Sequence, residues 1–151
     1  MRIACLPVLI CLLLATASQG DDAAKKEQEK LQGAWDVVLI ETAGEKTGPA
    51  RPMKWIIKGD RITQSIVNVA GAVREFSFEL DPSTSPKLID ITYQDSSRKG
   101  EKREGIYEVM GDDLKICMNS AQKDAPKQRP TEFETKSHPN FGMYVLRREK
   151  R

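Results

Sequence analysis

The chain has 151 residues, with 24 Lys and Arg against 22 Asp and Glu, which gives a formal net charge of +2. A balance this even provides no broad electrostatic field to attract nucleic acid or anionic lipid. The length suits a single domain with a core of ordinary size.

The N-terminus has the pattern of a secretory signal. Arg2 precedes the uncharged segment 3–17, small residues follow up to Gly20, and Asp21 begins an acidic stretch. This order of basic, apolar and small residues predicts a signal peptide over residues 1–20, with cleavage after Gly20 or alternatively after Ala17. A membrane anchor is the other interpretation, but segment 3–17 is shorter than the roughly 20 residues that span a bilayer. We therefore expect an exported protein, periplasmic or extracellular, with no stable membrane insertion after cleavage.

Cysteine usage fits a fold without disulfides. Two of the three cysteines, Cys5 and Cys11, lie within the predicted signal peptide, so Cys117 has no partner for an internal bridge. A secreted domain of this kind depends on its hydrophobic core for stability.

Residues 21–32 predict a short helical lead-in. The segment is charged, contains no proline or glycine, and ends at Gly33, which can stop a helix. A disordered, processed N-terminus is the alternative. After Gly33 the apolar period changes to two, with Trp35, Val37 and Leu39 on one face of a strand.

The rest of the chain alternates short strands with turns. Gly59-Asp60 and the segment 111–113 are tight hairpin turns, whereas 42–52, 81–86 and 120–130 have the composition of loops. We predict about nine strands. After the first, they are 54–58, 61–69, 73–80, 88–94, 105–110, 114–119, 131–135 and 143–148.

This order of elements predicts an all-β fold. Short connections without long helices disfavour parallel crossover units, and closure of the sheet removes exposed edges. We expect an up-and-down antiparallel β-barrel over residues 33–148, with a basic tail at 149–151. An eight-stranded barrel is about wide enough to be filled by side chains or to hold one small ligand.

Several blocks carry a family resemblance. They include Leu31-Gln32-Gly33-Ala34-Trp35, Gly105-Ile106-Tyr107, Gly111-Asp112-Asp113-Leu114-Lys115-Ile116-Cys117 and Arg129-Pro130-Thr131-Glu132-Phe133. In that order they resemble the lipocalin-like conserved domain family of planctomycete proteins, over about residues 30–148. The resemblance implies a lipocalin-like barrel and an exported protein, and it implies no activity, substrate or catalytic residue.

The same resemblance implies a structural plug at one end of the barrel. In lipocalins an arginine of the last strand lies over the indole of a Gly-x-Trp motif. Here Gly33 and Trp35 form the motif, and Arg147 or Arg148 would supply the cation. Such a contact contributes about 0.5–2 kcal/mol.

Nothing in the sequence predicts an enzyme or a metal site. The single histidine, His138, has a loop context, and Cys117 follows an apolar residue in a strand, where a buried thiol is usual. No Gly-x-Ser-x-Gly motif, Cys-x-x-Cys pair or calcium-loop motif is present. The basic clusters at 98–103 and 147–151 contain glutamate and lack interleaved aromatics, so we expect no nucleic-acid binding and no cofactor.

Two functional hypotheses stay open. In the first, the barrel encloses a small apolar ligand. In the second, the interior is filled and the protein is a structural or protein-interaction module whose loops 42–52 and 120–130 contact an unknown partner. The candidate ligand-binding residues are Gln64, Phe76, Phe78, Tyr93 and Tyr107.

Overall fold

The fold was analysed in a computed structural model, which describes residues 19–95, 98–119 and 128–150. One helix, α1 (Gln19–Leu31), precedes nine strands. The strands are β1 (Gly33–Thr42), β2 (Glu45–Thr47), β3 (Met53–Lys58), β4 (Arg61–Ile66), β5 (Val73–Asp81), β6 (Lys87–Tyr93), β7 (Lys102–Met110), β8 (Asp113–Asn119) and β9 (Phe141–Arg148). The predicted signal peptide lies almost entirely outside the described residues.

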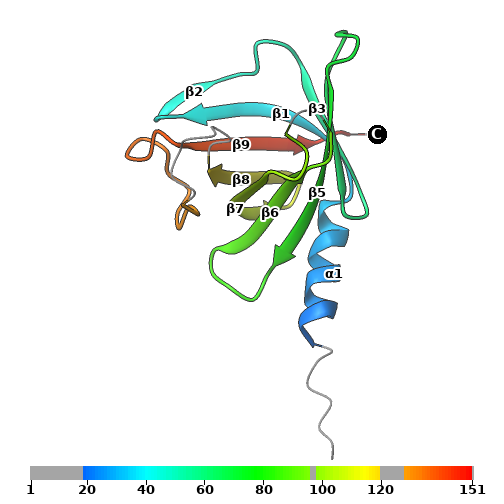
Figure 1. Cartoon of the computed structure of the whole chain (residues 1–151), viewed down its shortest axis with the longest axis vertical. Helices are drawn as coiled ribbons and strands as arrows, with labels where there is room; N and C mark the ends of the chain where they lie inside the picture. The colour runs from blue at the N-terminus through cyan, green and yellow to red at the C-terminus, as the bar shows by residue number, and fades with distance from the viewer. Residues whose placement is uncertain (1–18, 96–97, 120–127, 151) are drawn as a thin grey trace, which may run out of the picture.

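The strands form a closed antiparallel barrel, as the sequence predicts. From β3 to β9 each strand pairs with the next along the chain, and β1 pairs with both β3 and β9. β1 and β9 lie side by side in Figure 1. β2 is an extra strand that pairs only with the C-terminal end of β1, from Ile40 to Thr42. The prediction of an all-β, lipocalin-like barrel with a short N-terminal helix is therefore confirmed.

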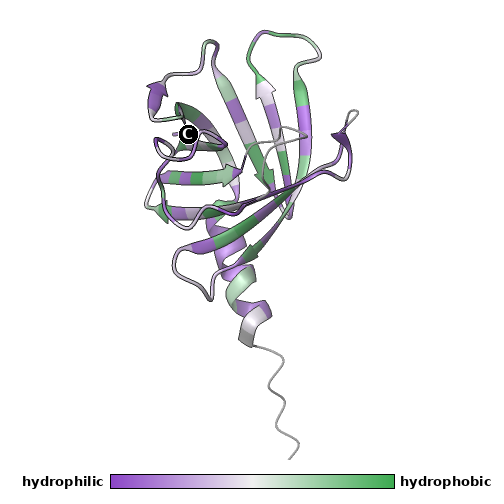
Figure 2. Cartoon of the chain, turned by 60° about the vertical axis from the view of Figure 1, so that its left-hand side comes forward, coloured by the Kyte–Doolittle hydropathy of each residue, from purple (hydrophilic) through white to green (hydrophobic). Residues whose placement is uncertain are grey.

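The core follows from the period of two along each strand. Inward side chains from all eight barrel strands form one buried cluster, and polar residues alternate with them, as the colours of Figure 2 show. Its fully buried members include Trp35, Ile62, Tyr107, Leu114 and Leu146. Burial of this apolar surface is the main stabilising contribution to the fold.

β1 departs from the predicted pattern. Its pairing with β9 shifts register between Val37 and Leu39, which is a β-bulge at Val38. An extra residue reverses the side of the sheet to which each following side chain points. Ile40, and not the predicted Leu39, therefore packs against the core. The bulge also leaves Val38 exposed.

Several further elements differ from the prediction. Residues 131–135 form no strand, and Phe133 instead packs from a loop onto the outside of the barrel. The predicted loop 42–52 contains β2, and β4 ends at Ile66 instead of continuing to Val69. Residues 120–127 of the predicted loop 120–130 lie outside the described part.

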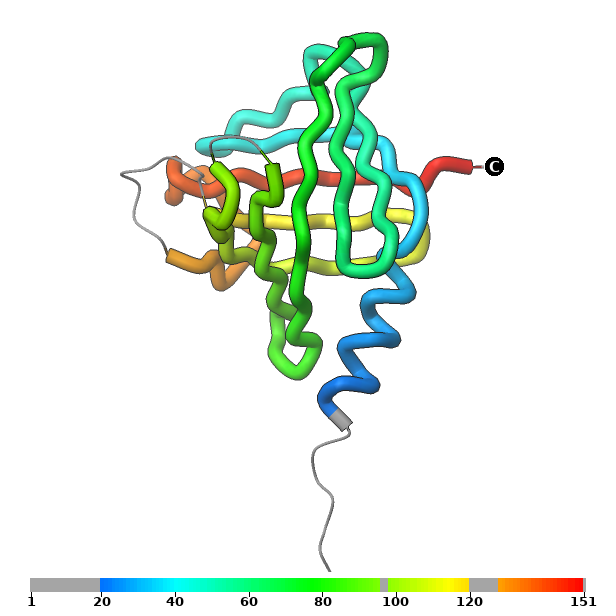
Figure 3. The backbone as a smooth tube through the Cα atoms, turned by 45° about the vertical axis from the view of Figure 1, so that its right-hand side comes forward, coloured from blue at the N-terminus to red at the C-terminus, as the bar shows by residue number. Residues whose placement is uncertain are grey.

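The two ends of the barrel are different. α1 lies beneath one end, next to the β3–β4 hairpin and the lower part of β5 (Figures 1 and 3). Gln32, just after the helix, donates a hydrogen bond to the carbonyl of Gly59 and accepts one from its N–H, at 3.0 and 2.7 Å. These bonds fix α1 to the hairpin, and we call this end the closed end.

Candidate functional site

The closed end is sealed by Trp35, at the position that the sequence singles out. Its side chain is fully buried, and its Nε1–H donates a 2.8 Å hydrogen bond to the carbonyl of Leu31 at the end of α1. The guanidinium carbon of Arg148 lies 4.1 Å from the centroid of the Trp35 ring. The indole is therefore held between the helix and the last strand.

Arg148 also completes the C-terminus of the helix. It donates hydrogen bonds to the carbonyls of Gln32 and Lys30, at 2.7 and 2.8 Å, and a cation at this place is favoured by the helix dipole. Gly33 has φ of +119°, and a Cβ there would stand 3.2 Å from the Arg148 Nη1. Arg147, the other predicted cation, points away and pairs with Asp113 at 3.0 Å.

Tyr107 belongs to the same closed end. Its hydroxyl lies 3.3 Å from Oε2 of the buried Glu27, which also pairs with Lys87 at 2.9 Å and with Lys30. Burial and the nearby Glu27 charge raise the pKa of Tyr107. Burial opposes the charge of Glu27, but hydrogen bonds from the two lysines outweigh it and lower the pKa of that carboxyl. The structure therefore places Tyr107 in a structural network.

The other four predicted ligand-binding residues divide between the two halves of the barrel. Phe78 is buried near the closed end, where it lines a groove with Ala24 of α1. Phe76 and Tyr93 contact each other edge to face with centroids 4.9 Å apart, and Arg98 lies over the Tyr93 ring. Gln64 is half-buried and donates to the sulfur of Met53 at 3.1 Å.

Trp55 is opposite Trp35 in the sheet, and a connected patch of half-buried side chains extends from it away from the closed end. Trp55 contacts Tyr144 with ring centroids 5.6 Å apart, and Tyr144 is opposite Ile40 in the sheet. Gln64 is opposite Trp55 on the neighbouring strand. Ile40, Met53 and Tyr144 all pack against the core while keeping partial exposure. We call Ile40, Met53, Trp55, Gln64 and Tyr144 the open-end patch.

Trp55 carries an unsatisfied donor. The residue is 3 % exposed, and its Nε1–H is buried with no hydrogen-bond partner among the described residues. Most buried polar groups in folded proteins have a partner, and leaving one unpaired costs about 1–3 kcal/mol. The sequence predicts only that Trp55 lies in a strand over residues 54–58, because it contains no sign of which indole would lack an acceptor.

A loop segment, residues 128–140, crosses the outer face of the barrel. Phe133 packs with Ile106, Cys117 and Phe141 in a second apolar cluster. Arg129 donates a 2.8 Å hydrogen bond to the carbonyl of Gly105 and pairs with Asp90 at 2.6 Å. We call this segment the strap.

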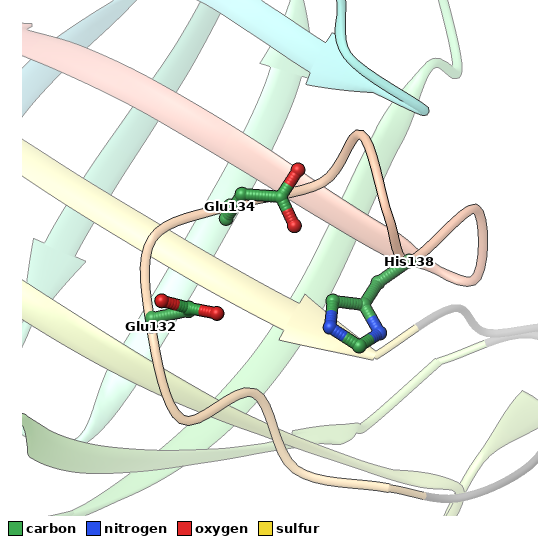
Figure 4. Close-up of side chains that lie close together, drawn as sticks. All are labelled: Glu132, Glu134 and His138. Atoms are coloured by element: carbon green, nitrogen blue, oxygen red, sulfur yellow. The ribbon is translucent and has the colours of Figure 1, made fainter.

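The strap brings three potential metal ligands together. Figure 4 shows Glu132, Glu134 and His138 gathered on the same side of the strap, with one ligand atom of each within 4.8 Å of the others. Sequence reasoning missed this cluster. The spacing Glu-x-Glu-x-x-x-His was available as a signal, but neither a helix nor a strand would place these three side chains together.

Cys117 lies under the strap as a buried thiol. Burial, together with the charges of Glu41 and Glu134, raises its pKa to about 11. At neutral pH such a cysteine is protonated, and the thiol is a poor nucleophile compared with the thiolate.

Comparison with known proteins gives no further assignment. A scan against protein-family models found no match, and neither did searches of curated proteins and of solved structures. Among the described residues, no helix has the length and apolar character needed to cross a bilayer.

Proposed function

We propose that this protein binds a small, mostly apolar molecule that carries one hydrogen-bond acceptor, in the end of the barrel opposite α1. The observation that carries the proposal is the buried Nε1–H of Trp55, which lacks a partner among the described residues. An acceptor on a bound molecule would satisfy it. Binding sites commonly combine an apolar lining with a few polar groups of this kind.

Burial along the barrel supports this location. The closed end is filled by side chains that exclude solvent, Trp35, Ile62 and Leu146 among them, and it leaves little room for a ligand. In the open-end patch the four residues around the buried Trp55 are half-buried, so part of their surface is accessible from outside. Gln64 adds a second polar side chain beside Trp55. The ligand that fits is therefore small and occupies only the part of the barrel at the open-end patch.

The alternative function is a protein-interaction or structural module with a filled core. The specific observation in its favour is the extent of the buried core cluster. It includes Leu31 beside the closed end and Met118 near the other end of β8. The two hypotheses differ in one respect that can be measured, because only the first predicts that a small molecule reaches the Trp55 indole.

The proposal includes export and membership of the lipocalin-like family that the sequence resembles. Both rest on the sequence. Export rests on the pattern of residues 1–20, and the family on the blocks from Leu31 to Phe133 that carry the resemblance. Sequencing the N-terminus of the protein from its own host tests export, because a start at Asp21 or Ser18 is expected and an intact Met1 contradicts it.

NMR of the two tryptophan indole groups tests ligand binding, with 1-octanol and n-octane as probes. The chain has only two tryptophans, and the Trp35 N–H already donates to Leu31, so it provides an internal reference. We expect 1-octanol to shift the Trp55 indole N–H signal strongly, octane to shift it less, and both to leave Trp35 in place. A Trp55 signal unmoved by either probe would refute the proposal.

A matched substitution sharpens the test. Trp55→Phe keeps an aromatic ring and removes the N–H, so the affinity for 1-octanol should fall about three- to tenfold, as expected for one neutral hydrogen bond. The affinity for octane should change much less. Equal losses for the two probes would mean that the indole contributes only apolar contact and would contradict the role of its N–H.

A further inference from the structure

The cluster of Glu132, Glu134 and His138 on the strap lies on the outside of the barrel. It is therefore separate from the open-end patch. The ligand atoms of the three side chains are all within 4.8 Å of one another. Around a metal ion with bonds of about 2.0–2.2 Å, ligand atoms are roughly 3–3.5 Å apart, so small side-chain rotations would close the set.

The backbone that carries these side chains is fixed to the barrel at several points. Thr135, between the two sides of the cluster, is fully buried and donates a 2.8 Å hydrogen bond to Glu41, while the N–H of Gly44 donates to its hydroxyl oxygen. Phe133 is packed in the outer apolar cluster. The positions from which the three ligands project are thus set by contacts that do not involve the ligands themselves.

The imidazole is oriented as well. The ring of His138 stacks on that of Phe141, with centroids 4.8 Å apart and an interplanar angle of 27°. The backbone N–H of His138 donates to the carbonyl of Thr135, and the backbone N–H of Phe141 donates to the carbonyl of His138. A stacked ring loses less rotational freedom when it coordinates an ion, which reduces the entropic cost of binding.

The charge of the cluster is not balanced within the part of the chain that the structure describes. Neither Glu132 nor Glu134 lies in an ion pair there, although most other acidic side chains of the strap's surroundings do, for example Asp90 with Arg129 and Glu108 with Lys115. Lys115 of β8 lies over the ring of Phe133 and pairs with Glu108, not with either glutamate of the cluster. Two carboxylates beside a histidine therefore present a local excess of negative charge.

From this arrangement we infer that Glu132, Glu134 and His138 form a binding site for a divalent first-row transition metal ion. One imidazole nitrogen and two carboxylate oxygens suit zinc and its neighbours, whereas the nitrogen ligand disfavours calcium and magnesium. Three protein ligands leave further positions to water, because Glu132 is exposed and the other two side chains are partly exposed. The site does not depend on the proposed ligand in the barrel.

Titration of untagged protein with Zn²⁺ tests the site. Calorimetry should show one ion bound per chain, and the imidazole signals of the single histidine should shift in NMR spectra as the ion is added. Zn²⁺ should also raise the unfolding temperature, because an ion that binds only the folded state stabilises it. No saturable binding at millimolar Zn²⁺, or binding that leaves the histidine signals unmoved, would overturn the inference.

Three conservative variants locate the ligands. His138→Phe retains a ring to stack on Phe141, and Glu134→Gln retains an acceptor for the Ser137 N–H, so each should fold as the wild type does. Both, and Glu132→Gln, should weaken Zn²⁺ binding about tenfold or more. Glu79→Gln, an exposed glutamate of β5, is the matched control and should bind as wild type. Equal affinities in all four variants would assign the ion to other groups.

Discussion

Two adjacent arginines of β9 have different roles, and the difference arises from the faces of the strand. Arg148 lies over the Trp35 ring and donates to two carbonyls at the end of α1. Arg147 points to the outside and forms an exposed pair with Asp113. The sequence could limit the cation to these two residues, because lipocalin-like barrels place it on the last strand. It could not choose between them without the register of β9.

Replacing each arginine in turn measures this difference. Arg148→Ala removes hydrogen bonds to the helix end and the contact with the indole, so it should lower the free energy of unfolding by about 1–3 kcal/mol. Arg147→Ala removes an exposed ion pair and should change it by less than about 1 kcal/mol. Urea denaturation followed by tryptophan fluorescence gives both values. Equal losses would contradict the assignment of the plug to Arg148.

Glu27 makes the closed end sensitive to acid. Hydrogen bonds from Lys30 and Lys87 hold its folded-state pKa below the value for an unfolded chain, about 4.3. A carboxyl with a lowered pKa contributes stability at pH values above its unfolded pKa, and this contribution is lost as the pH falls through its folded pKa. Wild type should therefore be more stable than Glu27→Gln at pH 7. The difference should shrink below about pH 4.

Denaturation of both proteins at a series of pH values between 7 and 3 checks this prediction. Asp60→Asn is a suitable control, because Asp60 is exposed and its contact with Arg61 is long, at 3.8 Å. A gap between wild type and Glu27→Gln that stays constant down to pH 3 would show that Glu27 contributes packing and no charge interaction.

At the scale of the elements, local signals were sufficient for the hairpins but not for the strap. The turns at Gly59 and Gly111 depend on residues within the turn itself, and the strands on either side were found from their alternation. Residues 131–135 show the same alternation around Phe133, yet they form no strand. Phe133 is half-buried against the outer faces of β7, β8 and β9, and this contact between distant residues leaves no local trace.

The bulge of β1 has a similar origin. A single extra residue at Val38 moves Ile40 to the core side, and its presence depends on the pairing with β9 about a hundred residues away in the chain. The candidate metal cluster and the unpaired indole could not be predicted for the same reason, since both are properties of contacts made after the chain has closed.

The strap is held to the barrel by Thr135. Its hydroxyl donates to Glu41, which is itself buried and also pairs with the more distant Lys46 at 3.7 Å. Thr135→Val keeps the volume but leaves Glu41 and the Gly44 N–H without this partner, so we expect a loss of about 1–3 kcal/mol. Thr131→Val, an exposed position on the same segment, should cost little. Thermal unfolding of the two variants separates the buried anchor from the general effect of the substitution.

At the scale of the whole molecule, stability depends on closure between the first and last strands. β1 pairs with β9 along almost its whole length, so the first and last strands of the barrel form one ladder, interrupted only by the bulge at Val38. Without that ladder the sheet has two long edges, and exposed edges promote association between chains. The barrel cannot be divided into independent halves, because each of its eight strands contributes to a single core.

Removal of β9 should therefore destroy the fold and not merely weaken it. A chain ending at residue 140 loses the partners of both β1 and β8, together with Leu146 and Arg148. We expect it to lack cooperative unfolding and to aggregate, since the folding of a closed sheet depends on contacts between residues far apart in the chain.

Addition of a synthetic peptide with residues 141–150 to the truncated chain should restore the barrel by filling the gap between β1 and β8. A peptide with Leu146 replaced by Asp should not, because it would bury a charge in the core. A truncated chain that unfolds cooperatively without any peptide would show that the barrel does not depend on closure.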